Sequence, residues 1–189
     1  RSCVSPCNGV VMASKRFVLL HHRAPGDTVV LTALIRDLYH AYRGQVEIDV
    51  DTSAMDLWRG NPYLTPLKQL GPKPGIAYIK CQYGQGIRDQ NHQTVHFLSY
   101  FHRDFEQQTG LRVPVRLPYP DLHLLPEEQA TVVNSRYWVV LSGGKSDFTA
   151  KVWEVRRMQE VVDRLLAQGL AVVQLGSNDP GHWHPPLEG

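Results

Sequence analysis

Short apolar runs alternate along the chain with longer segments of helical periodicity. Residues 17–22 (FVLLHH) form an apolar run that ends in a turn-forming cluster at residues 23–27. Across residues 28–43 apolar side chains recur at spacings of three and four, which predicts an amphipathic helix, and Gly44 marks its end. Residues 46–50 (VEIDV) alternate as a strand. Strand, helix and strand within ~35 residues predict a right-handed βαβ unit with parallel strands.

The pattern continues with a further strand and helix. Residues 76–81 read as a strand, and residues 94–108 as a helix that ends at Gly110. The apolar face of this helix carries Phe97, Leu98, Phe101 and Phe105. Residues 113–125, rich in proline and leucine, predict an extended connector.

A second βαβ unit follows the connector. The pattern predicts a strand, a glycine turn, a helix and a strand at residues 137–141, 142–145, 154–168 and 170–175. The chain is therefore expected to be an α/β protein with Rossmann-like, doubly wound parallel sheets. We expect a disordered tail (1–16), an N-terminal domain (17–130) and the start of a C-terminal domain (131–189). One βαβ unit of ~50 residues cannot cover both faces of a parallel sheet, so the second domain is expected to be incomplete.

Composition narrows the class of protein. The 189 residues include 20 Lys+Arg and 18 Asp+Glu, for a net charge of +2, and 42% are hydrophobic. This balance is typical of a globular domain rather than a disordered chain. No block of Lys and Arg occurs, which argues against a nucleic-acid binder. No apolar run approaches the ~20 residues of a membrane span, and the first fifteen residues lack the apolar region of a signal peptide.

Cysteine and histidine give little support for a metal or disulfide site. Cys3 and Cys7 lie in the tail, where Met12 is a plausible original start, and their spacing matches no standard zinc signature. We interpret them as incidental thiols in a reducing, cytoplasmic compartment. The nine histidines form no ligand pattern either, so no metal site is predicted.

Two glycine turns are candidates for chemistry, because ligands of doubly wound sheets bind beyond the carboxyl ends of the strands. At the first turn, Asp27 follows Gly26; its carboxylate could cap the following helix or take a proton from an attacking hydroxyl. At the second, residues 142–145 and Lys151 offer backbone N–H groups and two ammonium groups. That arrangement suits a diphosphate, although a flexible turn with solvated lysines explains it equally.

Several segments together resemble glycosyltransferase family 9, the ADP-heptose:lipopolysaccharide heptosyltransferases. The family's Arg-x-x-Gly-Asp turn is matched by Arg23 to Asp27, after a strand and before a helix. Asn61-Pro62-Tyr63-Leu64, Lys151-Val152-Trp153-Glu154 and the AVVQLG strand also look like the family. The chain departs from it in having Glu154 where proline is usual, and it contains no Asp-Ser/Thr-Gly-x-x-His segment.

The resemblance implies a GT-B architecture, with the acceptor on the N-terminal domain and the nucleotide sugar on the C-terminal one. Asp27 would be the catalytic base and Lys151 a contact to the donor phosphates. The rest of the implied donor site is Ser142, Gly143, Gly144 and Lys145, and the implied acceptor side is Arg23, Gly26 and Asn61. Neither a metal nor another cofactor is implied.

The resulting hypothesis is an inverting, metal-independent glycosyltransferase. It would move a heptose-like sugar from an ADP-sugar to a glycan, lipopolysaccharide-type or protein acceptor, in the cytoplasm, with or without peripheral contact to the inner membrane. The alternative is a non-catalytic Rossmann-like module that binds a nucleotide or sugar and is completed by a partner chain. An oxidoreductase is disfavoured because neither glycine turn has dinucleotide-binding spacing.

Overall fold

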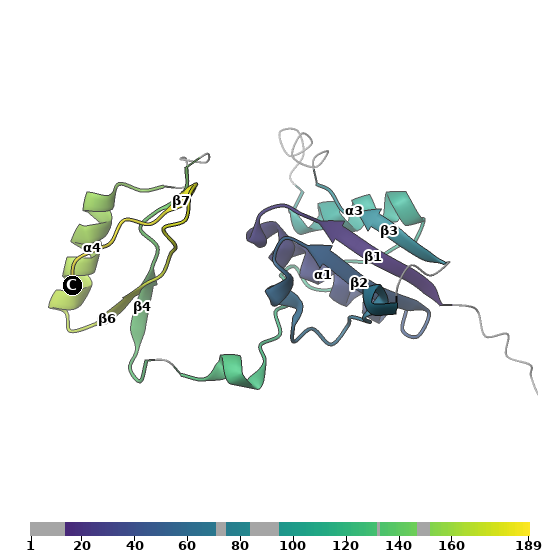
Figure 1. Cartoon of the computed structure of the whole chain (residues 1–189), viewed down its shortest axis with the longest axis horizontal. Coiled ribbons are helices and arrows are strands. Elements are labelled where there is room, and N and C mark those ends of the chain that lie inside the picture. The colour runs from purple at the N-terminus through teal and green to yellow at the C-terminus, as the bar shows by residue number, and fades with distance from the viewer. Residues whose placement is uncertain (1–13, 71–74, 84–94, 132, 147–151) are drawn as a thin grey trace, which may run out of the picture. The chain divides into compact units, whose positions relative to one another are not determined.

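The computed structural model describes residues 14–70, 75–83, 95–131, 133–146 and 152–189, and the chain divides into two compact units (Figure 1). Unit 1 is Arg1–Gln129 and unit 2 is Ala130–Gly189. The predictions made for Cys3, Cys7, Met12 and Lys151 lie outside the described residues.

Unit 1 is built on a small parallel sheet. Its strands are β1 (Lys15–His21), β2 (Val46–Thr52) and β3 (Ile76–Lys80), in the order β2-β1-β3. Leu19 of β1 pairs with Val50 on one side and with Ile79 on the other. The three predicted strands are confirmed, each within two residues of its expected bounds, and so is the α/β class with parallel pairing.

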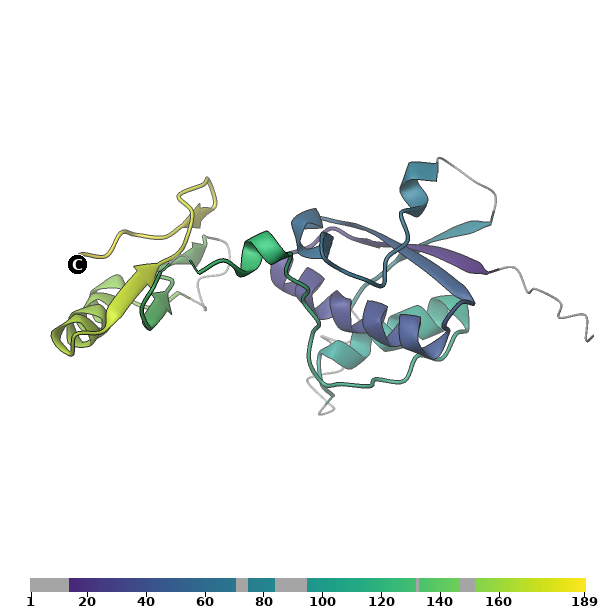
Figure 2. The ribbon, with the colours of Figure 1, turned by 90° about the horizontal axis from the view of Figure 1, so that it is seen from below.

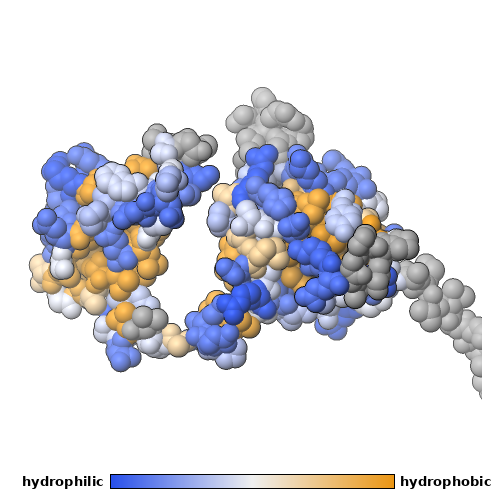
Figure 3. All heavy atoms as spheres, in the orientation of Figure 1, coloured by the Kyte–Doolittle hydropathy of each residue, from blue (hydrophilic) through white to orange (hydrophobic). Residues whose placement is uncertain are grey.

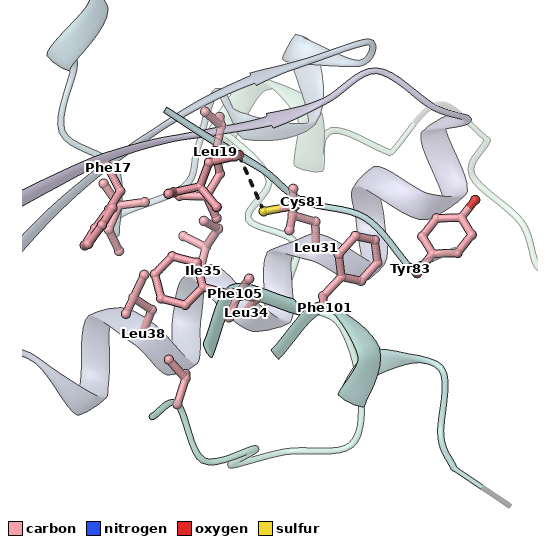
Figure 4. Close-up of a cluster of buried hydrophobic side chains, with 14 of the residues drawn as sticks. Phe17, Leu19, Leu31, Leu34, Ile35, Leu38, Cys81, Tyr83, Phe101 and Phe105 are labelled. Atoms are coloured by element: carbon pink, nitrogen blue, oxygen red, sulfur yellow. Dashed lines mark hydrogen bonds between the residues drawn. The ribbon is translucent and has the colours of Figure 1, made fainter. Parts of the chain in front are cut away.

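Helices α1 (Pro25–Ala41) and α3 (Leu98–Thr109) cover one face of this sheet (Figure 2). The helix α1 begins three residues before the predicted start, because proline fits the first helical position, where no backbone N–H is needed. The end of α3 is as predicted: Gly110 has φ 71° and its N–H donates to Glu106 O. The core between sheet and helices includes Phe17, Leu19, Leu31, Leu34, Ile35, Leu38, Phe101 and Phe105 (Figure 4).

Among the described residues, fewer elements pack against the other face of the sheet. Here the short 3-10 helix η2 (Leu67–Leu70) packs with Leu67 fully buried. Asp49 points to this face, where its Oδ2 accepts a hydrogen bond from the N–H of Lys68 at 2.9 Å. The described residues thus place both long helices of unit 1 on one face, and helices on both faces remain a prediction.

The proline-rich connector runs along α1 without helix or strand until η3 (Pro126–Gln129). Polar groups of α1 bind its backbone. Arg36 donates to Tyr119 O at 2.9 Å and to Leu117 O at 3.1 Å, and Thr32 Oγ1 accepts from the N–H of Asp121 at 2.8 Å. The predicted extended connector is confirmed, and these bonds explain why α1 buries polar side chains as well as apolar ones.

A buried charge cluster joins α1, α3 and the connector. Asp37 is fully buried; its Oδ1 accepts from Arg36 Nε at 2.8 Å. Its Oδ2 lies 3.0 Å from His102 Nε2 and accepts from the N–H of Arg116 at 3.1 Å. Charges this deep are tolerated when they are paired and hydrogen-bonded, as here.

Unit 2 contains a second parallel pair of strands and a helix. They are β4 (Tyr137–Val140), β6 (Ala171–Gln174) and α4 (Val155–Ala167), which confirms the predicted strand, helix and strand. A two-residue strand β5 (Gly144–Lys145) pairs antiparallel with β7 (His182–Trp183).

Much of the apolar surface of unit 2 is exposed. Among its described hydrophobic residues only Val140 and Val162 are buried. Figure 3 shows hydrophobic side chains gathered around β4 and β6. The exposed large side chains include Tyr137, Trp138, Val139, Leu141 and Leu175. No helix in the described residues has both the length and the apolar character needed to cross a membrane.

Candidate functional site

The carboxyl ends of the three parallel strands of unit 1 meet beside the first turn of α1. His21 ends β1 and pairs in register with Thr52, the last residue of β2. Backbone hydrogen bonds continue the sheet beyond these ends, from Ser53 N to His21 O at 3.3 Å and from Cys81 N to Leu20 O at 3.0 Å. The resulting edge carries the candidate base.

Asp27 is not the N-cap of α1. The cap is Ala24, in an extended conformation and without a side-chain cap bond, so Asp27 lies at the third helical position. The capping interpretation of Asp27 is therefore wrong, because Pro25 moves the helix start upstream. A carboxylate in the first turn still gains about 0.3–1 kcal/mol from the helix dipole.

Asp27 is held by a residue that the sequence analysis did not single out. The Tyr83 hydroxyl donates to Asp27 Oδ2 at 2.7 Å, across 56 residues of sequence. In the described part of the chain no group donates to Oδ1, and the Asp27 side chain is only partly buried. Among the described residues, one carboxylate oxygen is thus held by a hydrogen bond and the other is not.

Tyr83 follows β3 and closes one end of the core. Its ring centroid lies 4.8 Å from that of Phe97, 5.5 Å from Phe101 and 6.1 Å from His21. Figure 4 shows the hydroxyl pointing away from the core, beside the first turn of α1. Burial raises the pKa of Tyr83, and the hydrogen bond and charge of Asp27 add to this rise, while the guanidinium of Arg23 opposes it. The phenol therefore stays protonated and can donate at neutral pH.

Arg23 and Gly26 lie on the exposed side of the same turn. The Arg23 guanidinium stands 5.1 Å from the centroid of the Tyr83 ring, a cation–π arrangement. The Arg23 carbonyl accepts a hydrogen bond from the Ser53 hydroxyl. A Cβ added at Gly26 would meet nothing within 4 Å, so the described fold does not require glycine there. Arg23, Gly26 and Asp27 are thus brought together with Tyr83.

Two buried polar atoms near this edge lack partners among the described residues. They are His21 Nε2 and Thr28 Oγ1. The other ring nitrogen of His21, Nδ1, lies 3.0 Å from the carbonyl oxygen of Cys81. A carbonyl only accepts, so Nδ1 carries a proton, and Nε2 is the ring nitrogen without a partner among the described residues.

Asn61, predicted on the acceptor side, has a local structural role. Its Oδ1 accepts from the N–H of Tyr63 at 3.0 Å, which stabilises the turn after the 3-10 helix η1 (Met55–Trp58). The side-chain hydrogen bonds of Asn61 among the described residues do not reach Asp27. Its acceptor role stays a prediction.

The predicted turn at residues 142–145 is a packed segment that leads into β5. Ser142 is buried, and its hydroxyl donates to Pro185 O at 2.5 Å and accepts from Gln174 Nε2 at 2.8 Å. A Cβ at Gly143 would stand 1.9 Å from the carbonyl oxygen of Trp183. The segment is therefore packed rather than open at Ser142 and Gly143, because the chain near residues 183–185 lies directly against it.

The donor assignment of this segment stays a prediction. Gly144 and Lys145 pair with β7, opposite Trp183 and His182. Lys151 lies outside the described residues, so its contact to the donor phosphates stays a prediction as well. No group of three or more His, Cys, Asp or Glu side chains in the described ranges is placed to hold a metal ion.

Comparison with known proteins adds no assignment. Searches against protein-family models, curated protein sequences and solved structures return no significant match. The resemblance to glycosyltransferase family 9 therefore rests on the residues quoted for it.

Proposed function

We propose that the chain is an inverting, metal-independent glycosyltransferase of the family 9 type, with Asp27 as catalytic base. The observation that carries the proposal is the setting of Asp27: a partly buried carboxylate at the carboxyl edge of a parallel sheet, with one oxygen that accepts no hydrogen bond from the described residues. Ligands of open α/β sheets bind at this edge. The resemblance supplies the reaction class and, with it, a GT-B arrangement of two doubly wound domains.

In the proposed reaction Asp27 takes the proton of an acceptor hydroxyl. The acceptor oxygen then bonds to the anomeric carbon of a heptose-like sugar, and the bond from that carbon to the diphosphate breaks, releasing ADP with its electron pair. Glycans, lipopolysaccharide-type molecules and proteins all offer suitable hydroxyls.

The donor side is proposed on the resemblance alone. Lys151 would stabilise the charge that grows on the leaving diphosphate, next to Ser142, Gly143, Gly144 and Lys145. The acceptor would contact Arg23, Gly26 and Asn61. A cytoplasmic location, with or without contact to the inner membrane, belongs to the same proposal.

ADP release from ADP-heptose tests the proposal. Asp27→Asn keeps the shape of the side chain and an oxygen for the Tyr83 hydrogen bond, but it cannot accept the proton. We expect turnover to fall by about 10²–10⁴-fold, while the melting temperature falls by no more than the few degrees that a lost helix-dipole interaction of about 0.3–1 kcal/mol explains. Asp56→Asn is the matched control, because Asp56 is an exposed carboxylate in the first turn of η1. Near wild-type turnover in Asp27→Asn contradicts the assignment of the base.

A binding module completed by a partner chain is the second candidate. It is favoured by the exposure of β4, whose Tyr137, Trp138 and Val139 are each about half exposed. An apolar strand of this kind is typical of a parallel sheet covered on both faces. Calorimetry distinguishes the two candidates: a module binds ADP-heptose without releasing ADP, whereas the enzyme does both.

A further inference from the structure

The position of Asp27 on the helix does not by itself determine the orientation of its carboxylate. A partly exposed aspartate can occupy three staggered χ1 rotamers, and each aims its oxygens differently. The hydrogen bond of 2.7 Å from the Tyr83 hydroxyl to Oδ2 is compatible with a narrow set of them. It therefore selects an orientation and leaves Oδ1 free of described donors.

Tyr83 is well suited to hold another group in place. Its side chain is 9% exposed and belongs to the core of unit 1. Three aromatic rings surround it, those of His21, Phe97 and Phe101. Because the ring is fixed on several sides, its hydroxyl has a defined position relative to α1 (Figure 4).

We propose that Tyr83 is a positioning residue for Asp27: its hydroxyl holds Oδ2 so that Oδ1 faces the acceptor hydroxyl. This rests on the proposed function. In the transfer step the acceptor proton moves to Asp27 Oδ1, the acceptor oxygen bonds to the anomeric carbon, and the carbon–diphosphate bond breaks. Tyr83 keeps its own proton throughout and touches neither the donor nor the acceptor.

Tyr83→Phe tests the proposal because it removes the hydroxyl and retains the ring. The first readout is the set of three-bond NMR couplings across χ1 of Asp27, measured on the whole chain. We expect couplings of a single rotamer in the wild type and averaged couplings in the variant. The second readout is ADP release from ADP-heptose. We expect kcat to fall about 10- to 100-fold, because the variant loses one hydrogen bond to a charged group. The KM for ADP-heptose should change less than twofold.

The chain offers a matched control at another tyrosine–aspartate pair. The Tyr63 hydroxyl donates to Asp121 Oδ2 at 3.2 Å, and Tyr63 packs among the rings of Tyr39, His40 and His123. Tyr63→Phe also removes one hydroxyl from such a pair, so it should leave the Asp27 couplings and ADP release unchanged. Equal effects of the two variants would assign the loss to general loosening of unit 1 and overturn the proposal.

The outcomes separate this proposal from the proposed function. Single-rotamer couplings in Tyr83→Phe, or an unchanged kcat, overturn the positioning role. If the wild type itself releases no ADP, the proposed function is overturned, and with it any effect of Tyr83 on turnover. The couplings alone then decide whether Tyr83 orients Asp27. If Tyr83→Phe does not fold, Tyr83→Leu keeps an apolar side chain at the site without any donor, and its Asp27 couplings decide the same question.

Discussion

Removal of the Asp37 carboxylate should destabilise unit 1 more than any change at its surface. Asp37 is fully buried and binds Arg36, His102 and the backbone of Arg116 at 2.8–3.1 Å. Asp37→Ala leaves the buried guanidinium of Arg36 without its carboxylate and strips Arg116 N–H of its acceptor. Breaking a buried charge pair on one side costs about 3–5 kcal/mol. With a urea m-value of ~2 kcal/mol/M, the unfolding midpoint should fall by ~2 M.

Tryptophan fluorescence can report the unfolding of unit 1 alone, because unit 1 contains a single tryptophan. Trp58 is buried in the core of unit 1, and the other three tryptophans lie in unit 2. Urea unfolding is followed by Trp58 fluorescence in a chain whose other tryptophans are replaced by phenylalanine: Trp138, Trp153 and Trp183.

The control for Asp37 is an aspartate at the surface of the same unit. The Asp51 carboxylate is half-exposed and lies 3.8 Å from His22 Nε2. Exposed pairs contribute about 0–1 kcal/mol, so Asp51→Ala should shift the midpoint little. A loss below ~1 kcal/mol in Asp37→Ala would refute the reasoning, since it would mean that the carboxylate is not desolvated within the cluster.

Three further predictions follow from single side chains. Gly143→Ala should destabilise unit 2 by about 1–3 kcal/mol or more, because the new Cβ would meet the carbonyl oxygen of Trp183. Gly144→Ala should be tolerated, because the atom nearest to its new Cβ lies 3.7 Å away, and thermal melts of the two variants test the difference. Cys81 is 2% exposed, and burial raises the pKa of its thiol. In a chain whose other two cysteines are replaced by serine, alkylation of Cys81 should therefore require unfolding, and rapid labelling of the native chain would contradict this. The pKa of Tyr83 is raised in the folded state, so the protonated phenol stabilises the fold fully below pH ~10, and this stabilisation is lost as the pH rises through the folded-state pKa. Urea midpoints should therefore fall more steeply above pH ~10 in the wild type than in Tyr83→Phe.

Local sequence was enough to predict most elements of secondary structure. The apolar run of β1, the helical spacing in α1 and the alternation in β2 are patterns of neighbouring residues, and neighbours interact through the backbone geometry of one element. Gly110 at the end of α3 is a similar case, because a left-handed residue after a helix favours glycine wherever the helix packs.

The candidate site depended much more on tertiary structure. The Arg-x-x-Gly-Asp turn was visible in the sequence, but the helix start was not, and with it the place of Asp27 in the first turn. The pairing of Asp27 with Tyr83 joins residues 56 apart. A tyrosine in sequence carries no sign of its partner, and only the alignment of β3 beside β1 brings its hydroxyl to α1.

The packing of unit 2 and the polar side of α1 were likewise decided by distant contacts. Gly143 reads as a flexible turn residue in sequence, yet the backbone of Trp183 fills the space that a side chain would need. No local pattern marks Arg36 and Asp37 as buried, yet the connector covers them and supplies carbonyl and N–H partners. Sequence by itself determined which segments are strands and helices, because those preferences are local. The fold decided which polar groups are buried, bound or free, because that depends on which distant segments exclude water from them.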